Sequence, residues 1–140
     1  MTIFKRIIKE EHKMPAKLEE NRFEYKGYKY ITRKLGYRLE QIERDRDKLR
    51  FLGLNEHWWC GYVEIPKDHK VDGVEYDDIN IDCHGGLTYS RHEGDKWVIG
   101  FDCNHFDDNP IEQDEDYVKM ECQKIIDQLI QMEQANESNI

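Results

Sequence analysis

Two polar, glycine-containing stretches organise the chain: Asp82-Cys83-His84-Gly85-Gly86-Leu87-Thr88-Tyr89-Ser90 and, further along, Gly100-Phe101-Asp102-Cys103-Asn104-His105. Apolar and polar residues alternate along Ile79–His84, which is the period of a half-buried strand. Its two predicted faces carry Ile79, Ile81 and Cys83 on one side, and Asn80, Asp82 and His84 on the other. We therefore expect a strand over Ile79–His84, a continuation over Leu87–Ser90 and a return strand over Lys96–Cys103.

The return strand shows the same alternation, and its apolar face is predicted to hold Trp97, Ile99, Phe101 and Cys103. A turn over Arg91–Asp95, with Gly94 inside it, would pair the two strands antiparallel. That pairing would bring the regions of His84 and Asp102 to one end of the sheet. The polar residues predicted to form a ligand-binding site there are His84, Gly85, Gly86, Thr88, Tyr89, Asp102, Asn104 and His105.

The remaining elements follow from the flanking sequence. Residues 22–34 predict a hairpin that turns at Lys26-Gly27, and residues 37–52 predict a charge-rich helix. His57–Pro66 predicts a strand with Trp58, Cys60 and Tyr62 on one face and Trp59, Gly61 and Val63 on the other. Asp114 is expected to cap a C-terminal helix. The buried stripe of that helix is predicted to be Val118, Cys122, Ile125, Ile126 and Leu129.

Together these elements predict an α+β fold, with a mostly antiparallel sheet packed by the C-terminal helix and a charged helix inserted near residues 38–52. The chain of 140 residues fits one domain. We expect an N-terminal arm over residues 1–20, in which Ile3–Ile8 has helical spacing. The single domain is expected over 21–133 and a frayed polar tail over 134–140.

The net charge and hydropathy of the chain restrict the kinds of partner and location that we expect. A formal net charge of −9 argues against direct binding to nucleic acid, which requires positive charge, but it allows a basic protein partner, a metal ion or mimicry of nucleic acid. No apolar run is long enough to cross a membrane and no signal peptide opens the chain, so the expected location is cytosolic. The four cysteines lack C-x-x-C spacing, which predicts thiols or metal ligands and no disulfide.

Three kinds of chemistry remain open for the predicted site. A divalent metal is the first, because ligand types for zinc gather here, namely His84, His105, Asp82, Asp102 and Cys103. Nucleophilic catalysis is the second: Cys103 or Ser90 would attack, with His84 or His105 as base and Asp82 or Asp102 to orient it.

The third is a binding pocket without turnover. Gly85-Gly86 would expose backbone N–H groups, and the donors and stacking surfaces expected around them are Thr88, Tyr89, Asn104, His105, Trp58, Trp59 and Phe101. In the structural alternative, the glycines form a bulge and the aromatic rings pack in the core. Asp107-Asp108, with Asp102 and Asp114, would attract a cation, although such acidic loops are most often only solvated.

Several strings of this chain resemble a family of small proteins encoded largely by bacteriophages and prophages. The resemblance covers residues 22–130, and its most specific strings are His84-Gly85-Gly86-Leu87-Thr88-Tyr89-Ser90 and Gly100-Phe101-Asp102-Cys103-Asn104-His105. Further matching strings are Cys60-Gly61-Tyr62-Val63 followed by Pro66, Tyr76-Asp77-Asp78-Ile79, and Tyr117-Val118 with Glu121-Cys122. This chain departs from the family at Asn104, where members carry a small residue, and at Tyr37–Leu54, which looks like an insertion.

The resemblance implies an accessory role in the cytoplasm of a bacterial host, and it assigns no catalytic residue. Phage accessory proteins of this size are often counter-defence factors. We expect a small ligand, nucleotide-like in chemistry, to bind around His84 and His105. Two alternatives remain: an acidic inhibitor that blocks a host nucleic-acid-binding defence protein, and a metal- or Cys-dependent hydrolase of a nucleotide signal.

Overall fold

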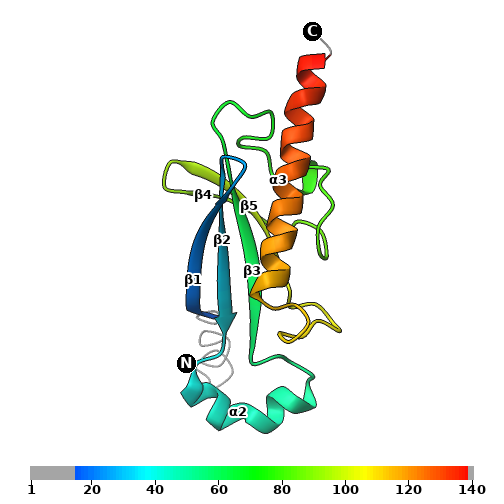
Figure 1. Ribbon diagram of the computed structural model, residues 1–140. Helices are drawn as coiled ribbons and strands as arrows, with labels where there is room; N and C mark the ends of the chain where they lie inside the picture. The colour runs from blue at the N-terminus through cyan, green and yellow to red at the C-terminus, as the bar shows by residue number, and fades with distance from the viewer. Residues whose placement is uncertain (1–14, 139–140) are drawn as a thin grey trace.

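The computed structural model describes residues 15–138. Its strands are β1 (Ala16–Tyr25), β2 (Tyr28–Gly36), β3 (His57–Ile65), β4 (Tyr89–Glu93) and β5 (Lys96–Asp102). Its helices are α2 (Leu39–Phe51), the short 3-10 helix η1 (Tyr76–Asp78) and α3 (Glu115–Ser138) (Figure 1). The predicted Ile3–Ile8 element lies outside the described residues.

The five strands form one sheet in the order β1-β2-β3-β5-β4, and each neighbouring pair is antiparallel. Helix α3 lies along one face of this sheet, and α2 lies beyond one end of it (Figure 1). The predicted α+β class is therefore confirmed. Neither α2 nor α3, the two long helices of the described part of the chain, has the length and hydropathy that a membrane span requires.

The β1–β2 hairpin turns at Lys26 and Gly27, both of which have positive φ, as a two-residue turn requires. Its first strand begins at Ala16, so residues 16–20, which we expected in the N-terminal arm, belong to the sheet. The strand β3 alternates as predicted: Trp59 and Val63 pack in the core under α3, whereas Trp58 and Tyr62 belong to a second apolar cluster.

Helix α3 seals the main core. The predicted stripe is fully buried, with Val118, Cys122, Ile125, Ile126 and Leu129 all 0% exposed. The helix packs closely on the sheet at Gly61, where an added Cβ atom would lie 2.6 Å from the Cys122 sulfur. Asp114 accepts the backbone N–H of Tyr117, which is the predicted N-terminal cap. Helix α3 continues to Ser138, into the range 134–140 expected as a polar tail.

The expected strand over Ile79–His84 is wrong as secondary structure, although its pattern of burial is right. Ile79, Ile81 and Cys83 are buried and Asp82 is exposed, but the segment is not a strand of the sheet. Besides bonds within the loop, three of its backbone groups, on Asp82 and His84, bond side chains of α3. Gln128 accepts the N–H of Asp82 at 2.8 Å and donates to the carbonyl of Asp82 at 2.7 Å.

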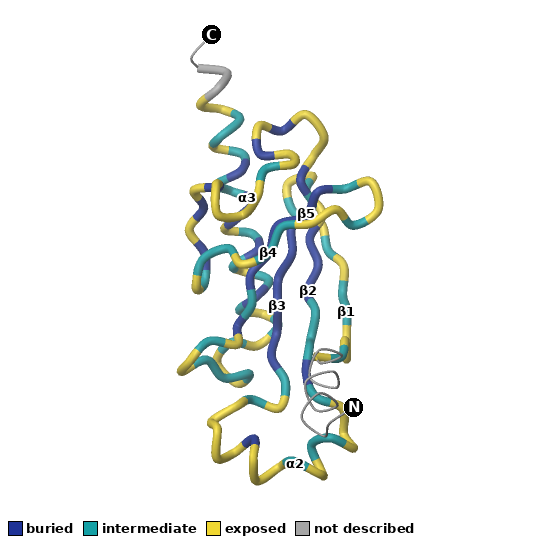
Figure 2. The backbone as a smooth tube through the Cα atoms, turned by 180° about the vertical axis from the view of Figure 1, so that it is seen from behind, coloured by how far each residue is buried: buried dark blue, intermediate teal, exposed yellow. Residues whose placement is uncertain are grey.

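Helix α2 is present where the sequence predicts it, but it packs little. Of its apolar positions only Leu49 is buried, and Leu39 and Phe51 are exposed. The backbone departs from helical geometry at Asp45, where the predicted stripe is interrupted. Figure 2 shows this contrast, with buried residues concentrated on β3 and its neighbours and α2 mostly exposed.

Candidate functional site

Two histidines from different loops meet beside the N-terminal part of α3. His84 ends the extended segment after buried Cys83, and His105 follows the end of β5. Their ring centroids are 5.7 Å apart. The alternation that buries Cys83 turns His84 away from the core interior, and the antiparallel return of β5 brings His105 to the same end. The two histidines of the predicted site therefore lie together.

Asp108 links the two imidazoles. One carboxylate oxygen lies 2.8 Å from Nε2 of His84, and the other lies 3.0 Å from Nδ1 of His105. The backbone N–H of His105 also donates to this carboxylate, at 2.9 Å. Burial raises the pKa of Asp108, but the hydrogen bonds from His84 and His105 outweigh it and hold that pKa below its usual range.

Helix α3 fixes His84 from the other side. Nδ1 of His84 lies 2.7 Å from the hydroxyl of Tyr117, and the backbone N–H of His84 donates to Glu121 at 2.7 Å. Burial, followed by the charge of Glu121, raises the pKa of Tyr117, so the phenol stays protonated near neutral pH. Since the ionised Asp108 only accepts, Nε2 of His84 carries a hydrogen and, in the neutral ring, Nδ1 accepts from Tyr117.

Gly85 makes room for the His105 ring. Its φ is +66°, and an added Cβ would lie 2.4 Å from Cε1 of His105. Gly86 also has positive φ, at +79°, but faces open space. Gly85 is exposed, and its backbone N–H makes no hydrogen bond within residues 15–138. The turn therefore offers a side-chain-free approach to the two imidazoles, as expected for this pair of glycines.

The other predicted binding residues make their side-chain hydrogen bonds outside the histidine cluster. Thr88 donates to Asp102 at 3.0 Å, and the second carboxylate oxygen of Asp102 accepts the backbone N–H of Asn104. Tyr89 belongs to the second apolar cluster and donates to Glu93. Within the described part of the chain, no hydrogen bond joins these residues to the histidine cluster. The single predicted site is therefore divided.

The expected stacking surfaces are wrong, because those aromatic rings serve the packing. Trp59 and Phe101 lie in the core under α3, and Trp58 lies in the second apolar cluster; all three are buried. Both faces of β3 are covered, one by the core under α3 and the other by the second apolar cluster, so its aromatic side chains have no surface to offer a ligand.

The predicted nucleophiles are not arranged for attack. Cys103 is 1% exposed, and burial raises the pKa of its thiol far above the neutral range, so it is not a thiolate. Ser90 donates to Glu75 and accepts the backbone N–H of Tyr76, so its hydroxyl is paired with groups other than the two histidines. All four cysteines are buried free thiols, as predicted.

Of the predicted metal ligands, only the two histidines are brought together. Asp82 is exposed and pairs with Lys124, Asp102 bonds Thr88, and Cys103 is in the core. Asp108 takes their place, because one ligand atom from each of His84, His105 and Asp108 lies within 4.8 Å of the others. No other group of this kind occurs among residues 15–138.

Sequence reasoning missed part of the site. The sequence indicates Asp108 only as a member of an acidic loop, and Tyr117 and Glu121 only as part of the strings that resemble the phage family. Asp108 lies three residues after His105, and this short spacing in a loop was the available signal. Tyr117 and Glu121 are four residues apart, so they lie on one face of the helix, next to the buried stripe. Nothing in the sequence places that face against His84.

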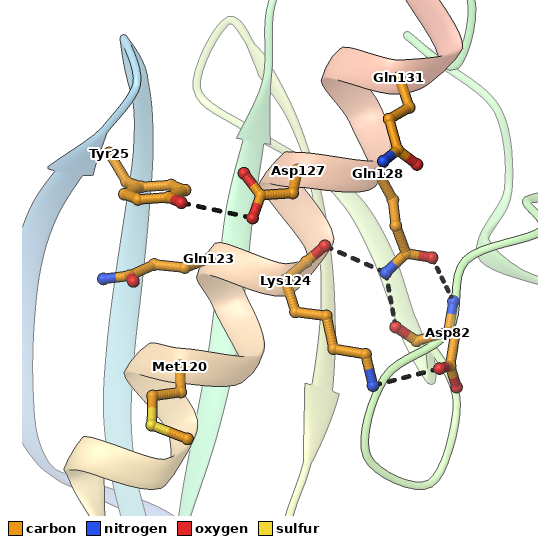
Figure 3. A pocket seen from close by; sticks show the side chains of 8 residues that line it. All are labelled: Tyr25, Asp82, Met120, Gln123, Lys124, Asp127, Gln128 and Gln131. Atoms are coloured by element: carbon orange, nitrogen blue, oxygen red, sulfur yellow. Dashed lines mark hydrogen bonds and ion pairs between the residues drawn. The ribbon is translucent and has the colours of Figure 1, made fainter.

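A shallow groove of about 410 Å³ lies elsewhere, along the outer side of α3. It is lined by Tyr25, Asp82, Met120, Gln123, Lys124, Asp127, Gln128 and Gln131 (Figure 3). Several of these side chains bond one another across the groove, as Lys124 does with Asp82 and Tyr25 with Asp127. The groove contains neither histidine, so it is not part of the candidate site.

A comparison of the chain with models of protein families, with curated proteins and with solved structures finds no match.

Proposed function

We propose that this protein is a phage-type accessory protein, active in counter-defence, that works by binding a small anionic ligand at the His84–His105 site. The resemblance in the His84–Ser90 and Gly100–His105 strings supports the phage-type role. The observation that carries the binding site is the approach of the two imidazoles, 5.7 Å between ring centroids, beside the open Gly85-Gly86 turn.

A small ligand with a phosphate group fits the donors of this turn. The backbone N–H of Gly85 is exposed and unused within the described residues, and the His105 side chain is 37% exposed. N–H groups of a glycine turn and of an imidazole are donors that phosphate oxygens accept. A nucleotide-like signal would supply such oxygens, which is why we favour it as the ligand class.

Binding without turnover fits the site better than hydrolysis by a nucleophilic side chain. The Cys103 thiol is buried in the core and Ser90 bonds Glu75, so neither has a histidine within hydrogen-bond reach. Covalent catalysis requires nucleophile and base in that contact. The Cys-dependent hydrolase is therefore the weakest of the three classes.

The test is a ligand screen by isothermal titration calorimetry with mono-, di- and cyclic nucleotides. We expect one nucleotide class to bind the parent and to lose at least tenfold in affinity in His84→Ala and His105→Ala. His92→Ala is the matched control, because His92 is an exposed histidine that packs against Trp97 on the β4–β5 hairpin. Equal affinity in all three variants would exclude this site.

An acidic protein inhibitor is the second candidate, and one observation favours it. The net charge is −9, and an exposed acidic run follows β3, formed by Asp68, Asp72, Glu75, Asp77, Asp78 and Asp82. Such a surface would attract the basic groove of a nucleic-acid-binding protein. Counter-defence activity that survives in His84→Ala and fails after Asp77→Asn with Asp78→Asn would select this function over ligand binding.

A further inference from the structure

We propose that the site holds one divalent transition-metal ion, with His84, His105 and Asp108 as its three protein ligands. One ligand atom from each residue lies within 4.8 Å of the other two, although the residues come from two separate loops. Imidazole nitrogen and carboxylate oxygen are ligand types that zinc and its neighbours accept. Two histidines and one carboxylate also leave a coordination position for a water or a ligand oxygen.

Asp108 is positioned as a ligand before any ion arrives. Its side chain is 8% exposed, and its two oxygens point to different imidazoles at 2.8 and 3.0 Å. The backbone of Asp108 is held on both sides of its Cα atom: its N–H donates to the carbonyl of His105, and its carbonyl accepts from the side chain of Asn55 at 2.9 Å. An ion would replace the imidazole hydrogens that now share this carboxylate, and the residues would need little rearrangement.

Tyr117 acts as a positioning residue for His84. A histidine that binds a metal through one nitrogen commonly donates its other N–H to a fixed acceptor, which orients the ring. The hydroxyl of Tyr117, 2.7 Å from Nδ1, can accept as well as donate, so it serves the ring in either tautomer. Nε2 of His84, which faces Asp108, is then the nitrogen left for the ion.

One side of the cluster remains accessible. The His105 side chain is 37% exposed, and no Cβ at Gly85 covers its ring. Water, or an oxygen of a bound molecule, can therefore reach the position that the three residues leave open. This arrangement differs from a closed structural site, in which the protein supplies all four ligands.

A metal ion here would explain how the proposed anionic ligand binds, and only this part of the inference rests on the proposed function. The carboxylate of Asp108 lies between the imidazoles and repels a phosphate, so the histidines by themselves attract a phosphate weakly. A bound divalent ion would reverse the local charge and offer a direct bond to a phosphate oxygen. The metal itself depends only on the geometry of His84, His105 and Asp108.

The test uses the full chain after dialysis against a chelator. We expect one equivalent of Co²⁺ to bind and to produce visible d–d absorption bands, which Zn²⁺ then removes by displacement. His105→Ala and Asp108→Asn should each abolish the bands; the Asn variant nearly preserves the shape of the carboxylate. Tyr117→Phe should lower Zn²⁺ affinity by about 10–100-fold, as loss of such an orienting contact usually does.

His92→Ala is the control and should bind one equivalent with the parent's affinity, because His92 lies on the β4–β5 hairpin. Circular dichroism and melting temperature verify that each variant is folded. Absence of Co²⁺ bands in the folded parent would overturn the metal proposal. Bands that persist in both His105→Ala and Asp108→Asn would overturn it as well, because the ion would then occupy other ligands.

A nucleotide titration with and without Zn²⁺ separates this inference from the proposed function. Nucleotide binding that requires Zn²⁺ supports both. Binding that is equally strong in the chelated protein contradicts the metal inference and leaves the proposed function intact. A protein that binds Zn²⁺ at these residues but no nucleotide confirms the metal and contradicts the proposed ligand class.

Discussion

Gly85 is the residue on which the shape of the histidine cluster most directly depends. Its φ of +66° is strained for any L-residue with a side chain, and its missing Cβ leaves the space that the His105 ring fills. Gly86, the next residue, has the same strain without the contact, because no atom lies within 4 Å of its Cβ position. Substitutions at Gly85 and Gly86 therefore distinguish an effect of backbone strain from an effect of contact with His105.

Gly85→Ala and Gly86→Ala should each lower the free energy of unfolding by about 1–2 kcal/mol, since both force an alanine into the left-handed region. Only Gly85→Ala should move the His105 ring. We expect the Cε1–H NMR signals of His84 and His105 to shift in Gly85→Ala and to remain in place in Gly86→Ala. Matching histidine spectra for the two variants would show that Gly85 does not shape the cluster.

The sequence predicts the meeting of His84 and His105 but not their contacts with Asp108 and Tyr117. Alternation along Ile79–His84 and an antiparallel return are local patterns, and together they bring the two histidines to one end of the fold. Tyr117 joins them through a tertiary contact that neither residue type nor spacing encodes, whereas the short spacing from His105 is the only sequence signal for Asp108. Thr88 and Asp102 share the same stretch of sequence, yet they bond each other and not the histidines.

Among the elements, the extended segment Ile79–His84 shows what a period of two does and does not determine. The pattern correctly predicts which side chains are buried, because any extended chain against an apolar surface alternates in this way. It does not determine which groups bond the backbone. Here the amide of Gln128 and the carboxylate of Glu121 take the place of a neighbouring strand, so the segment adjoins α3 and not the sheet.

Gln128→Glu tests this replacement, because it retains the acceptor for the Asp82 N–H and removes the donor to the Asp82 carbonyl. We expect a loss of about 1 kcal/mol in the free energy of unfolding and faster hydrogen exchange at the Asp82 amide. Gln131→Glu, which adds the same charge at an exposed position one turn on, should leave both unchanged. Equal exchange rates in the two variants would contradict the proposed attachment.

The buried stripe of α3 should be essential to the stability of the fold. Ile125 is 0% exposed in the main core, so Ile125→Asp would bury an unpaired carboxylate and lose apolar contacts. We expect it to lower the free energy of unfolding by at least about 4 kcal/mol, measured by urea denaturation. Met120→Asp, on the same helix but 64% exposed, should change it by no more than about 0.5 kcal/mol.

In the whole molecule, the side chain of Arg33 links strands across the sheet face opposite α3, a role that the sequence pattern does not predict. Arg33 on β2 bonds Glu20 on β1 and Glu93 on β4, each at 2.7 Å, although β1 and β4 are opposite edges of the sheet. Its guanidinium also lies 4.5 Å from the ring centroid of Tyr62 on β3. The twisted sheet must therefore curl across this face, and strand periodicity alone does not predict that curl.

Arg33→Gln should lower the free energy of unfolding by about 2 kcal/mol at pH 7, a value between those of exposed and fully buried ion pairs. The hydrogen bond from Arg33 holds the pKa of Glu20 below its usual range; for Glu93, burial raises the pKa, but the bonds from Arg33 and Tyr89 outweigh it. Carboxylates with lowered folded pKa values stabilise the protein above their unfolded pKa, about 4.3, and this contribution is lost as the pH falls through the folded values. The difference in unfolding free energy between the parent and Arg33→Gln should therefore shrink between pH 7 and pH values below about 4.

Arg22→Gln is the control, because it removes an exposed arginine beside the same Glu20, and it should cost at most about 0.5 kcal/mol at either pH. Urea denaturation of the three proteins across this range measures both effects, and a difference for Arg33→Gln that does not change with pH would show that its carboxylate partners do not carry the stabilisation.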